Sequence, residues 1–273
     1  MKSKGKFPDL HTPIVMGILN ITPDSFYDGG RYQAEQHYAI RTEKMIADGA
    51  AIIDIGGASS RPGAKEISAE DEWHRIHPVI QSTRSTHPDI CISVDTCHAS
   101  VAEKCLEAGA DMINDISGGT FDPDMARVIG SHKAPYVMMH IQGRPGNMQT
   151  DPKYDDVVED IAAFFESQIN NFMKHGASQL ILDPGFGFGK TLKHNYTLLN
   201  RLDRFTAFGY PILVGLSRKS MINKVLDINP EDAINGTTVL NTIALLRGAG
   251  ILRVHDVREA VEAIKLVENL KQG

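Results

Sequence analysis

A short pattern repeats along the chain and limits the folds that the chain can adopt. Glycine and alanine precede an apolar run that closes on a polar residue, in segments 49–54, 109–114, 176–183 and 248–253. Glycine takes the left-handed conformation that ends a helix with little strain, and the apolar runs suit strands that are buried on both faces. Each copy therefore predicts the end of a helix followed directly by a buried strand.

Four more apolar runs bring the number of predicted strands to eight. They cover residues 14–19, 90–94, 136–139 and 212–214, and each follows a proline within two residues. Helical patterns are predicted between the strands, over residues 33–48, 69–85, 99–107, 123–131, 155–174, 193–204, 231–246 and 257–271. Such alternation predicts a parallel sheet that closes into a (β/α)8, or TIM, barrel, and an open doubly wound sheet is the alternative. A barrel of this kind takes about 250 residues as one unit, so the 273 residues predict a single domain over residues 1–273.

Composition excludes several classes of protein. The chain is 42% hydrophobic and 23% charged, as is usual for globular proteins. It has no apolar run near the roughly 18 residues that cross a membrane, and its N-terminus lacks the apolar stretch of a secretory signal. Three cysteines without a C-x-x-C pair argue against a disulfide framework and a structural zinc site. We therefore expect a cytoplasmic protein with reduced cysteines and no membrane partner.

The polar residues that close the apolar runs are the first candidates for a functional site. Active sites of such barrels lie at the C-terminal ends of the strands, although any one of these residues alone has a simpler explanation as a helix cap or turn residue. In chain order they are Asn20, Asp54, Asp95, Asn114, His140, Asp183, Ser217, Arg218, Lys219, Arg253 and His255.

These candidates form two chemical groups. Asp95, Asn114 and Asp183 offer hydrogen-bond acceptors that complement a heterocycle with adjacent N–H donors. Lys219, Arg253 and His255 offer donors and positive charge that complement phosphate. The net charge of −6 gives no general attraction to nucleic acid, so an anionic ligand needs such a local cluster. One ligand could satisfy both groups, or the two groups could pair with each other over the barrel mouth.

Three loops contain glycine and polar residues. The segment 183–191 has three residues between Gly185 and Gly189, where a P-loop needs four, and Lys190 stands where a dinucleotide motif needs glycine. We interpret it as backbone that passes close to a flat ligand, with Phe188 packed nearby. Loops 20–30 and 56–63 are long enough to be lids, and Arg61 in the second could bind a phosphate or a carboxylate.

Nine segments in order along the chain resemble the dihydropteroate synthase family, which couples a pterin pyrophosphate to p-aminobenzoate. They are residues 17–26, 53–57, 60–63, 93–96, 113–119, 139–143, 183–190, 217–220 and 253–257. Ala58 stands where a Glu is frequent in the family, and Ile141 where a Met is frequent. Ser60 replaces a common Thr, keeping the hydroxyl but losing a methyl group.

The resemblance implies roles for particular residues, a Mg2+ ion held by Asn20, a homodimer, and sulfonamide binding by mimicry of p-aminobenzoate. Asp95, Asp183, Lys219 and Asn20 would be the catalytic residues. The implied pterin site comprises Asp95, Asn114, Ile116, Met139, Asp183, Gly187 and Lys219. The implied pyrophosphate site comprises Asn20, Arg61, Arg253 and His255, and the implied p-aminobenzoate site comprises Ser60, Arg61, Pro62, Phe188 and Ser220.

Other functions share parts of this pattern. A pterin-dependent methyltransferase would have the same barrel and the carboxylate–Asn pterin site, but it would have little use for the basic cluster. A Schiff-base aldolase would use Lys219 as its nucleophile. A non-catalytic pterin-binding protein is the third alternative.

Overall fold

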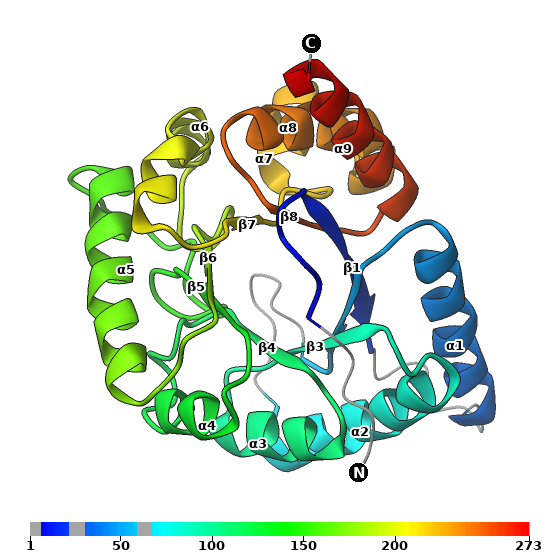
Figure 1. The fold of residues 1–273 in the computed structure, drawn as a ribbon. Coiled ribbons are helices and arrows are strands. Elements are labelled where there is room, and N and C mark those ends of the chain that lie inside the picture. The colour runs from blue at the N-terminus through cyan, green and yellow to red at the C-terminus, as the bar shows by residue number, and fades with distance from the viewer. Residues whose placement is uncertain (1–6, 22–30, 59–66, 273) are drawn as a thin grey trace.

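The structure is a computed structural model that describes residues 7–21, 31–58 and 67–272, with only the backbone described for residues 31–35. Within these ranges, strands and helices alternate around one barrel (Figure 1). The strands are β1 (Ile14–Asn20), β2 (Ile52–Gly56), β3 (Cys91–Asp95), β4 (Met112–Asp115), β5 (Tyr136–Met139), β6 (Leu180–Asp183), β7 (Leu213–Val214) and β8 (Ile251–Val254). The α-helices are α1 (Arg31–Ala47), α2 (Ala69–Thr86), α3 (Ala99–Ala108), α4 (Met125–His132), α5 (Val157–Lys174), α6 (Leu192–Asn200), α7 (Ser220–Leu226), α8 (Ile234–Leu246) and α9 (Val257–Gln272).

The strands form a closed parallel barrel. Their order in the sheet is β6-β5-β4-β3-β2-β1-β8-β7, and every pair is parallel. Leu182 pairs with Ile212, and the Leu182 amide donates to the Pro211 carbonyl at 2.9 Å, so β6 meets β7 and no open edge remains between them. The prediction of a (β/α)8 barrel is therefore confirmed over an open sheet.

An apolar layer fills the interior of the barrel, and a polar layer lies above it. One residue from each strand builds the apolar layer, against which Phe7 and Leu10 pack: Met16, Ile52, Cys91, Met112, Val137, Ile181, Leu213 and Ile251. Side chains alternate along a strand, so residues two positions further on also face the interior. On five strands these residues are polar: Asp54, Ser93, Asn114, Asp183 and Arg253. The polar layer thus starts where the strands approach their C-terminal ends.

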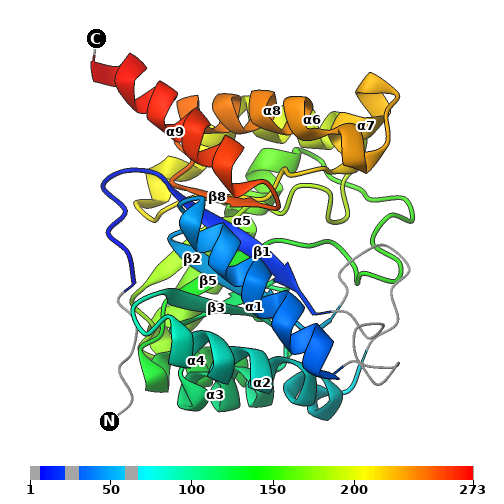
Figure 2. The same cartoon turned by 90° about the vertical axis from the view of Figure 1, so that its right-hand side faces the viewer.

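A second apolar core lies between the barrel and its helices. Figure 2 shows this packing from the side, with α1 running along β1. The core contains large, fully buried side chains such as Phe165, Phe172 and Phe205. All three cysteines are free, and Cys91 and Cys105 are buried. None of the helices in the described part of the chain combines the length and apolar composition that a membrane span requires.

The helices of the structure follow the sequence pattern closely, with three differences. The glycines that open the repeated pattern, Gly49, Gly109, Gly176 and Gly248, have φ angles of 104°, 112°, 89° and 96°, as predicted for helix stops. The predicted helix 193–204 is instead α6 followed by a 3-10 helix, Leu202–Phe208, and helix 231–246 is split by a turn before α8. Helix α7 was not predicted, because its seven residues span only two turns and give too short a periodic pattern.

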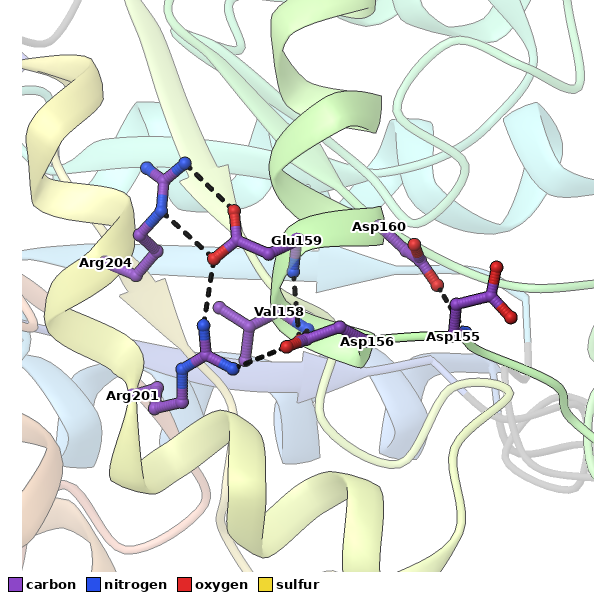
Figure 3. Close-up of polar contacts among 7 residues, drawn as sticks. All are labelled: Asp155, Asp156, Val158, Glu159, Asp160, Arg201 and Arg204. Carbon is purple, nitrogen blue, oxygen red and sulfur yellow. Dashed lines mark hydrogen bonds and ion pairs between the residues drawn. The ribbon is translucent and has the colours of Figure 1, made fainter.

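Charged side chains connect the start of α5 to the end of α6 (Figure 3). Asp156 caps α5 by accepting from the amides of Val158 at 2.9 Å and Glu159 at 3.3 Å. Arg201 donates to Asp156 at 2.8 Å and to Glu159 at 2.9 Å, and Arg204 donates to the same glutamate. The hydrogen bond from Arg201 lowers the pKa of Asp156 below its ordinary value. This network connects two neighbouring helices on the outside of the barrel.

Candidate active site

Most of the predicted site residues lie around one mouth of the barrel, at the C-terminal ends of the strands. Figure 1 shows the strands whose ends form this mouth. Asn20, Asp95, Met139 and Asp183 are the last residues of their strands, and Asn114 and Arg253 lie one residue before the end. Ile116 and His255 lie just beyond β4 and β8, and Lys219 and Ser220 open α7. Gly187 and Phe188 follow β6, whereas Ser60, Arg61 and Pro62 lie outside the described residues.

Arg253 joins the acidic and basic groups of the mouth. Its Nε donates to Oδ2 of Asp54 at 2.7 Å, and its Nη2 donates to Oδ2 of Asp95 at 2.8 Å. The same Oδ2 of Asp54 accepts from Nδ2 of Asn114 at 3.0 Å. Acceptors and a cation from different strands therefore lie within hydrogen-bonding distance. The acidic and basic groups therefore pair with each other across the mouth, as one of the two alternatives predicted, and Arg253 makes that pairing.

Asp95 and Asp183 carry raised pKa values for the same main reason. Burial raises the pKa of Asp95 to about 7; Arg253 opposes the shift, and Asp54 adds to it. Burial also raises the pKa of Asp183, against the opposing effects of Lys219 and of the hydrogen bond from the Gly185 amide. A ligand that offers hydrogen-bond donors or positive charge would therefore stabilise the ionised form of both carboxyl groups.

Lys219 and His255 show the opposite shift. Burial lowers the pKa of Lys219 to about 8, partly offset by Asp183. Its Nζ donates to the Phe186 carbonyl and lies 4.7 Å from the ring centroid of Phe188. Burial, with Arg253 and Arg41 nearby, lowers the pKa of His255 to about 4. His255 is therefore neutral at pH 7 and offers a hydrogen bond rather than a charge.

Asn20 and Asp95 face a common space above Gly56. A Cβ built on Gly56 would lie 3.6 Å from Oδ1 of Asn20 and 3.9 Å from Oδ2 of Asp95. Oδ1 of Asn20 and Oδ2 of Asp95 therefore lie on the same side of Gly56, and Arg253 donates to the second of these oxygens. No cluster of three or more His, Cys, Asp or Glu side chains that could hold a metal occurs in the described ranges.

The glycine-rich loop after β6 is held by a buried lysine. Lys190 Nζ donates to the carbonyls of Gly185 and Phe188, both at 2.9 Å, and approaches Nδ1 of His140 at 3.1 Å. Burial lowers the pKa values of both Lys190 and His140. Gly185 has a φ of 71°, and a Cβ there would collide with the His140 carbonyl oxygen. His140 thus supports the loop, and the sequence indicated no such role for Lys190.

Arg218 differs from its neighbour Lys219 in what it binds. Its guanidinium forms two hydrogen bonds to Asp256, at 2.9 and 2.7 Å, and also donates to the carbonyls of Pro230 and Glu231. Ser217 Oγ accepts from the His255 amide at 3.2 Å. Of the basic pair 218–219, Arg218 therefore connects loops, and Lys219 remains for a ligand.

The chain is similar to known proteins over nearly its whole length. The family model described as "Pterin binding enzyme" matches residues 16–255. A dihydropteroate synthase of Synechocystis is 46% identical over 259 residues, covering 94% of this chain and 89% of the relative. A dihydropteroate synthase of Escherichia coli is 44% identical over 268 residues, covering 97% and 94%.

Solved structures give the same result. The Yersinia pestis dihydropteroate synthase in a sulfonamide drug complex has a TM-score of 0.92 at 42% identity, covering 100% of this chain and 99% of that chain. The Xanthomonas albilineans dihydropteroate synthase with 4-aminobenzoic acid has a TM-score of 0.88 at 37% identity, covering 96% and 94%. By sequence and by fold, this chain belongs to the dihydropteroate synthase family of pterin-binding enzymes, which are transferases.

Proposed function

We propose that the chain joins 6-hydroxymethyl-7,8-dihydropterin pyrophosphate to p-aminobenzoate, giving 7,8-dihydropteroate and pyrophosphate in folate biosynthesis. The observation that carries the proposal is the meeting of acceptors and cations at one barrel mouth, where Arg253 lies 2.8 Å from Asp95. A pterin diphosphate carries N–H donors at one end and phosphate at the other, so one molecule complements both groups. The basic group favours this reaction over that of a pterin-dependent methyltransferase, which binds no pyrophosphate.

The pterin ring is proposed to bind among Asp95, Asn114, Asp183 and Lys219. Asn114 donates through Nδ2 to Asp54, so its Oδ1 is left as an acceptor. The carboxyl groups of Asp95 and Asp183 are buried, and their raised pKa values make them sensitive to incoming donors. Met139, Ile116 and Gly187 lie at or just after the ends of β5, β4 and β6. The first two are proposed to give the pterin ring apolar contacts, and Gly187, which has no side chain, to let the ring approach the backbone.

The diphosphate is proposed to bind Arg253, His255, Asn20 and Arg61. Arg253 supplies a planar guanidinium that suits phosphate oxygens. His255 supplies a neutral hydrogen-bond donor, because its pKa is lowered to about 4. An incoming anion would favour the protonated form of His255, so its charge would increase as the diphosphate arrives.

A Mg2+ ion is proposed to bind at Oδ1 of Asn20, beside Gly56. Mg2+ keeps several waters and takes few protein ligands beside substrate phosphates, and Oδ1 of Asn20 is such a ligand. The space above Gly56 is lined by this oxygen and by Asp95 Oδ2. When bound, the ion would help to neutralise the leaving pyrophosphate.

The p-aminobenzoate is proposed to bind beside Phe188 and Ser220, and Ser60, Arg61 and Pro62 are proposed as further contacts from outside the described residues. Lys219 lies over the Phe188 ring, which connects this edge to the pterin side of the mouth. An arylamine is neutral at pH 7 and needs no general base, so these residues act mainly by positioning it. Departure of pyrophosphate leaves positive charge on the pterin, which Asp95 and Asp183 are placed to stabilise.

Release of pyrophosphate from the dihydropterin substrate, with and without p-aminobenzoate, tests the proposal. We expect release to depend on the amine, and mass spectrometry to show the joined product in equal amount. The same assay with 4-nitrobenzoate, which lacks the nucleophilic amine, should give no joined product. Release at one rate whether or not the amine is present would contradict a synthase.

A homodimer is proposed to form through one face of the barrel. Eight of the eleven exposed large apolar side chains in the described residues lie in segment 225–270. Five of them lie on α8 and α9, whose exposed surface we call the α8–α9 face: Val239, Ile243, Leu246, Leu266 and Leu270. Figures 1 and 2 show these two helices side by side, and a groove of about 310 Å3 lies between them. Exposed apolar patches of this kind mark interfaces.

The cytoplasmic location of the protein stays a prediction.

A further inference from the structure

Asp54 belongs to the polar layer, but the proposed site assigns it no contact with a substrate. It is fully buried, whereas the side chains of Asp95 and Arg253 remain 16% and 18% exposed at the mouth above it. It lies two residues beyond Ile52 of the apolar layer, at the base of the site. A ligand at the mouth would therefore meet Asp95 and Arg253 before it could reach Asp54.

One oxygen of Asp54 orients two ligand-binding side chains at once. Its Oδ2 accepts from Nε of Arg253 at 2.7 Å and from Nδ2 of Asn114 at 3.0 Å. These two residues belong to β8 and β4, and the proposed function assigns them to the diphosphate and the pterin. Asp54 is thus shared by the two halves of the proposed site.

The two hydrogen bonds set what each partner presents to a ligand. With its Nδ2 on Asp54, Asn114 keeps Oδ1 as an acceptor for a heterocyclic N–H. With its Nε edge on Asp54, Arg253 keeps its two terminal nitrogens for other partners, and Nη2 donates to Asp95. When pterin donors take Oδ2 of Asp95, Arg253 can give up that bond while its Nε contact to Asp54 persists.

We propose that Asp54 is a positioning residue of the synthase reaction, on which Arg253 pivots from Asp95 to the diphosphate while the Asn114 amide stays oriented towards the pterin. The inference rests on the proposed function, because it concerns how that substrate is held. Asp54 acts through its two partners and does not touch the reacting atoms.

Three variants test this role. Asp54→Ala removes both hydrogen bonds. Asp54→Asn can keep both, because its amide oxygen replaces Oδ2 and its nitrogen replaces Oδ1, which accepts no hydrogen bond from the described residues. Ser93→Ala is the matched control: Ser93 pairs with Asp54 in the sheet, is fully buried, and its Oγ has no hydrogen-bond partner within the described ranges.

Steady-state kinetics, with each substrate varied in turn, should show different effects on the two KM values. Asp54→Ala should raise the KM for the dihydropterin pyrophosphate at least about tenfold and leave the KM for p-aminobenzoate within about twofold. Asp54→Asn should lie closer to the natural protein than to Asp54→Ala, and Ser93→Ala should match the natural protein. If Asp54→Ala does not fold, Asp54→Ser takes its place, since its shorter hydroxyl cannot accept both hydrogen bonds in the same positions.

Three outcomes would overturn the inference while the natural protein remains active. They are an Asp54→Ala variant that behaves like Ser93→Ala, an equal rise in both KM values, and an Asp54→Asn variant no better than Asp54→Ala. A natural protein that forms no joined product would instead contradict the proposed function. Calorimetric binding of inorganic pyrophosphate with Mg2+ then still tests Asp54, because weaker binding to Asp54→Ala than to Ser93→Ala is expected without turnover.

Discussion

At the scale of single residues, two groups at the barrel mouth have pKa values close to neutral pH. Burial raises the pKa of Asp95 to about 7 and lowers that of Lys219 to about 8. Each group loses hydration on burial, which disfavours its charged form. A ligand that pairs with both groups restores both charges. Substrate binding and protonation are therefore linked.

Lys219 should give the enzyme an alkaline limit. Its pKa is lowered to about 8, so its positive charge is present below that pH and is lost as the pH rises through it. We expect kcat/KM for the pterin substrate, which reports the free enzyme, to fall above about pH 8. Arginine stays charged, so Lys219→Arg should be slower but should lack this limb. A profile that stays flat to pH 10 in the natural protein would contradict the assignment.

Asp183 should contribute through its negative charge. Asp183→Asn keeps an oxygen that can accept from the Gly185 amide, now at 2.7 Å, but cannot stabilise a cationic pterin. We expect kcat to fall about tenfold to a thousandfold, the range for loss of one electrostatic group. A thermal melt close to that of the natural protein would show that the loss is chemical. Normal turnover would refute the electrostatic role.

The sequence predicted which residues would lie at the mouth but not how they would pair. Asp95, Asn114, Asp183 and Arg253 each close an apolar run, and strand alternation is enough to bring them to one end of the barrel. The bonds from Arg253 to Asp54 and Asp95 depend on the side-chain conformation of a long residue reaching across from β8. Likewise, the sequence predicts a charged His255, and only its burial and its three-dimensional neighbours show that its pKa is lowered.

At the scale of elements, the loop after β6 depends on one buried side chain. Lys190 bonds to carbonyls of Gly185, Phe188 and His140, so Lys190→Met would leave buried acceptors without partners. We expect the free energy of unfolding to fall by about 2–4 kcal/mol. The KM for p-aminobenzoate should also rise, because Phe188 loses its anchor. Chemical denaturation and steady-state kinetics measure the two effects.

Lys193→Met is the matched control for Lys190→Met. Lys193 lies three residues further on and is exposed in α6. Its replacement should change stability by no more than about 0.5 kcal/mol, as for most surface substitutions. Equal losses in the two variants would mean that the buried lysine does not hold the loop.

The start of α5 offers a separate test of local stability (Figure 3). Asp156→Ala removes a helix cap and an ion pair, and we expect a loss of about 1 kcal/mol in unfolding free energy. Asp155→Ala, an exposed neighbour whose side chain caps nothing, should change little. The folded pKa of Asp156 is lowered, so its contribution is present above the unfolded pKa and is lost as the pH falls through the folded value. Urea melts at pH 7 and pH 3 should show the difference between the variants shrinking.

Element boundaries were predictable where glycine ends a helix and less so elsewhere. Gly109 ends α3 with a φ of 112°, and the strand follows within three residues. Helix α7 has no comparable signal: it begins beside Lys219 without a capping side chain and buries only Met221 and Ile222. Tertiary contacts rather than local preference therefore define α7.

At the scale of the whole molecule, one sequence period explains both the barrel and its site. Alternation along the strands places an apolar layer, including Met16 and Ile251, below a polar layer, including Asp54 and Arg253. Closure between β6 and β7 depends on the two-residue strand β7 and one bridge from Leu182 to Ile212. The number of predicted βα units already indicates this closure. A parallel sheet of eight strands with helices on one side buries its two edge strands only by pairing them with each other.

The α8–α9 face should hold two copies of the chain together. The apolar side chains of helix α8 are not confined to one face, so packing against the barrel cannot bury all of them, and Val239 remains 50% exposed. Val239→Glu and Leu266→Glu should place charge in the proposed interface and convert a dimer to a monomer in sedimentation experiments. Ile40→Glu is the matched control, since Ile40 is 60% exposed on α1, and it should leave the dimer intact. The bonds from Arg253 to Asp54 and Asp95 lie within one chain, so we expect monomeric variants that stay folded to retain pterin binding. A natural protein that sediments as a monomer at all concentrations, or an Ile40→Glu variant that dissociates as fully as Val239→Glu, would contradict this interface.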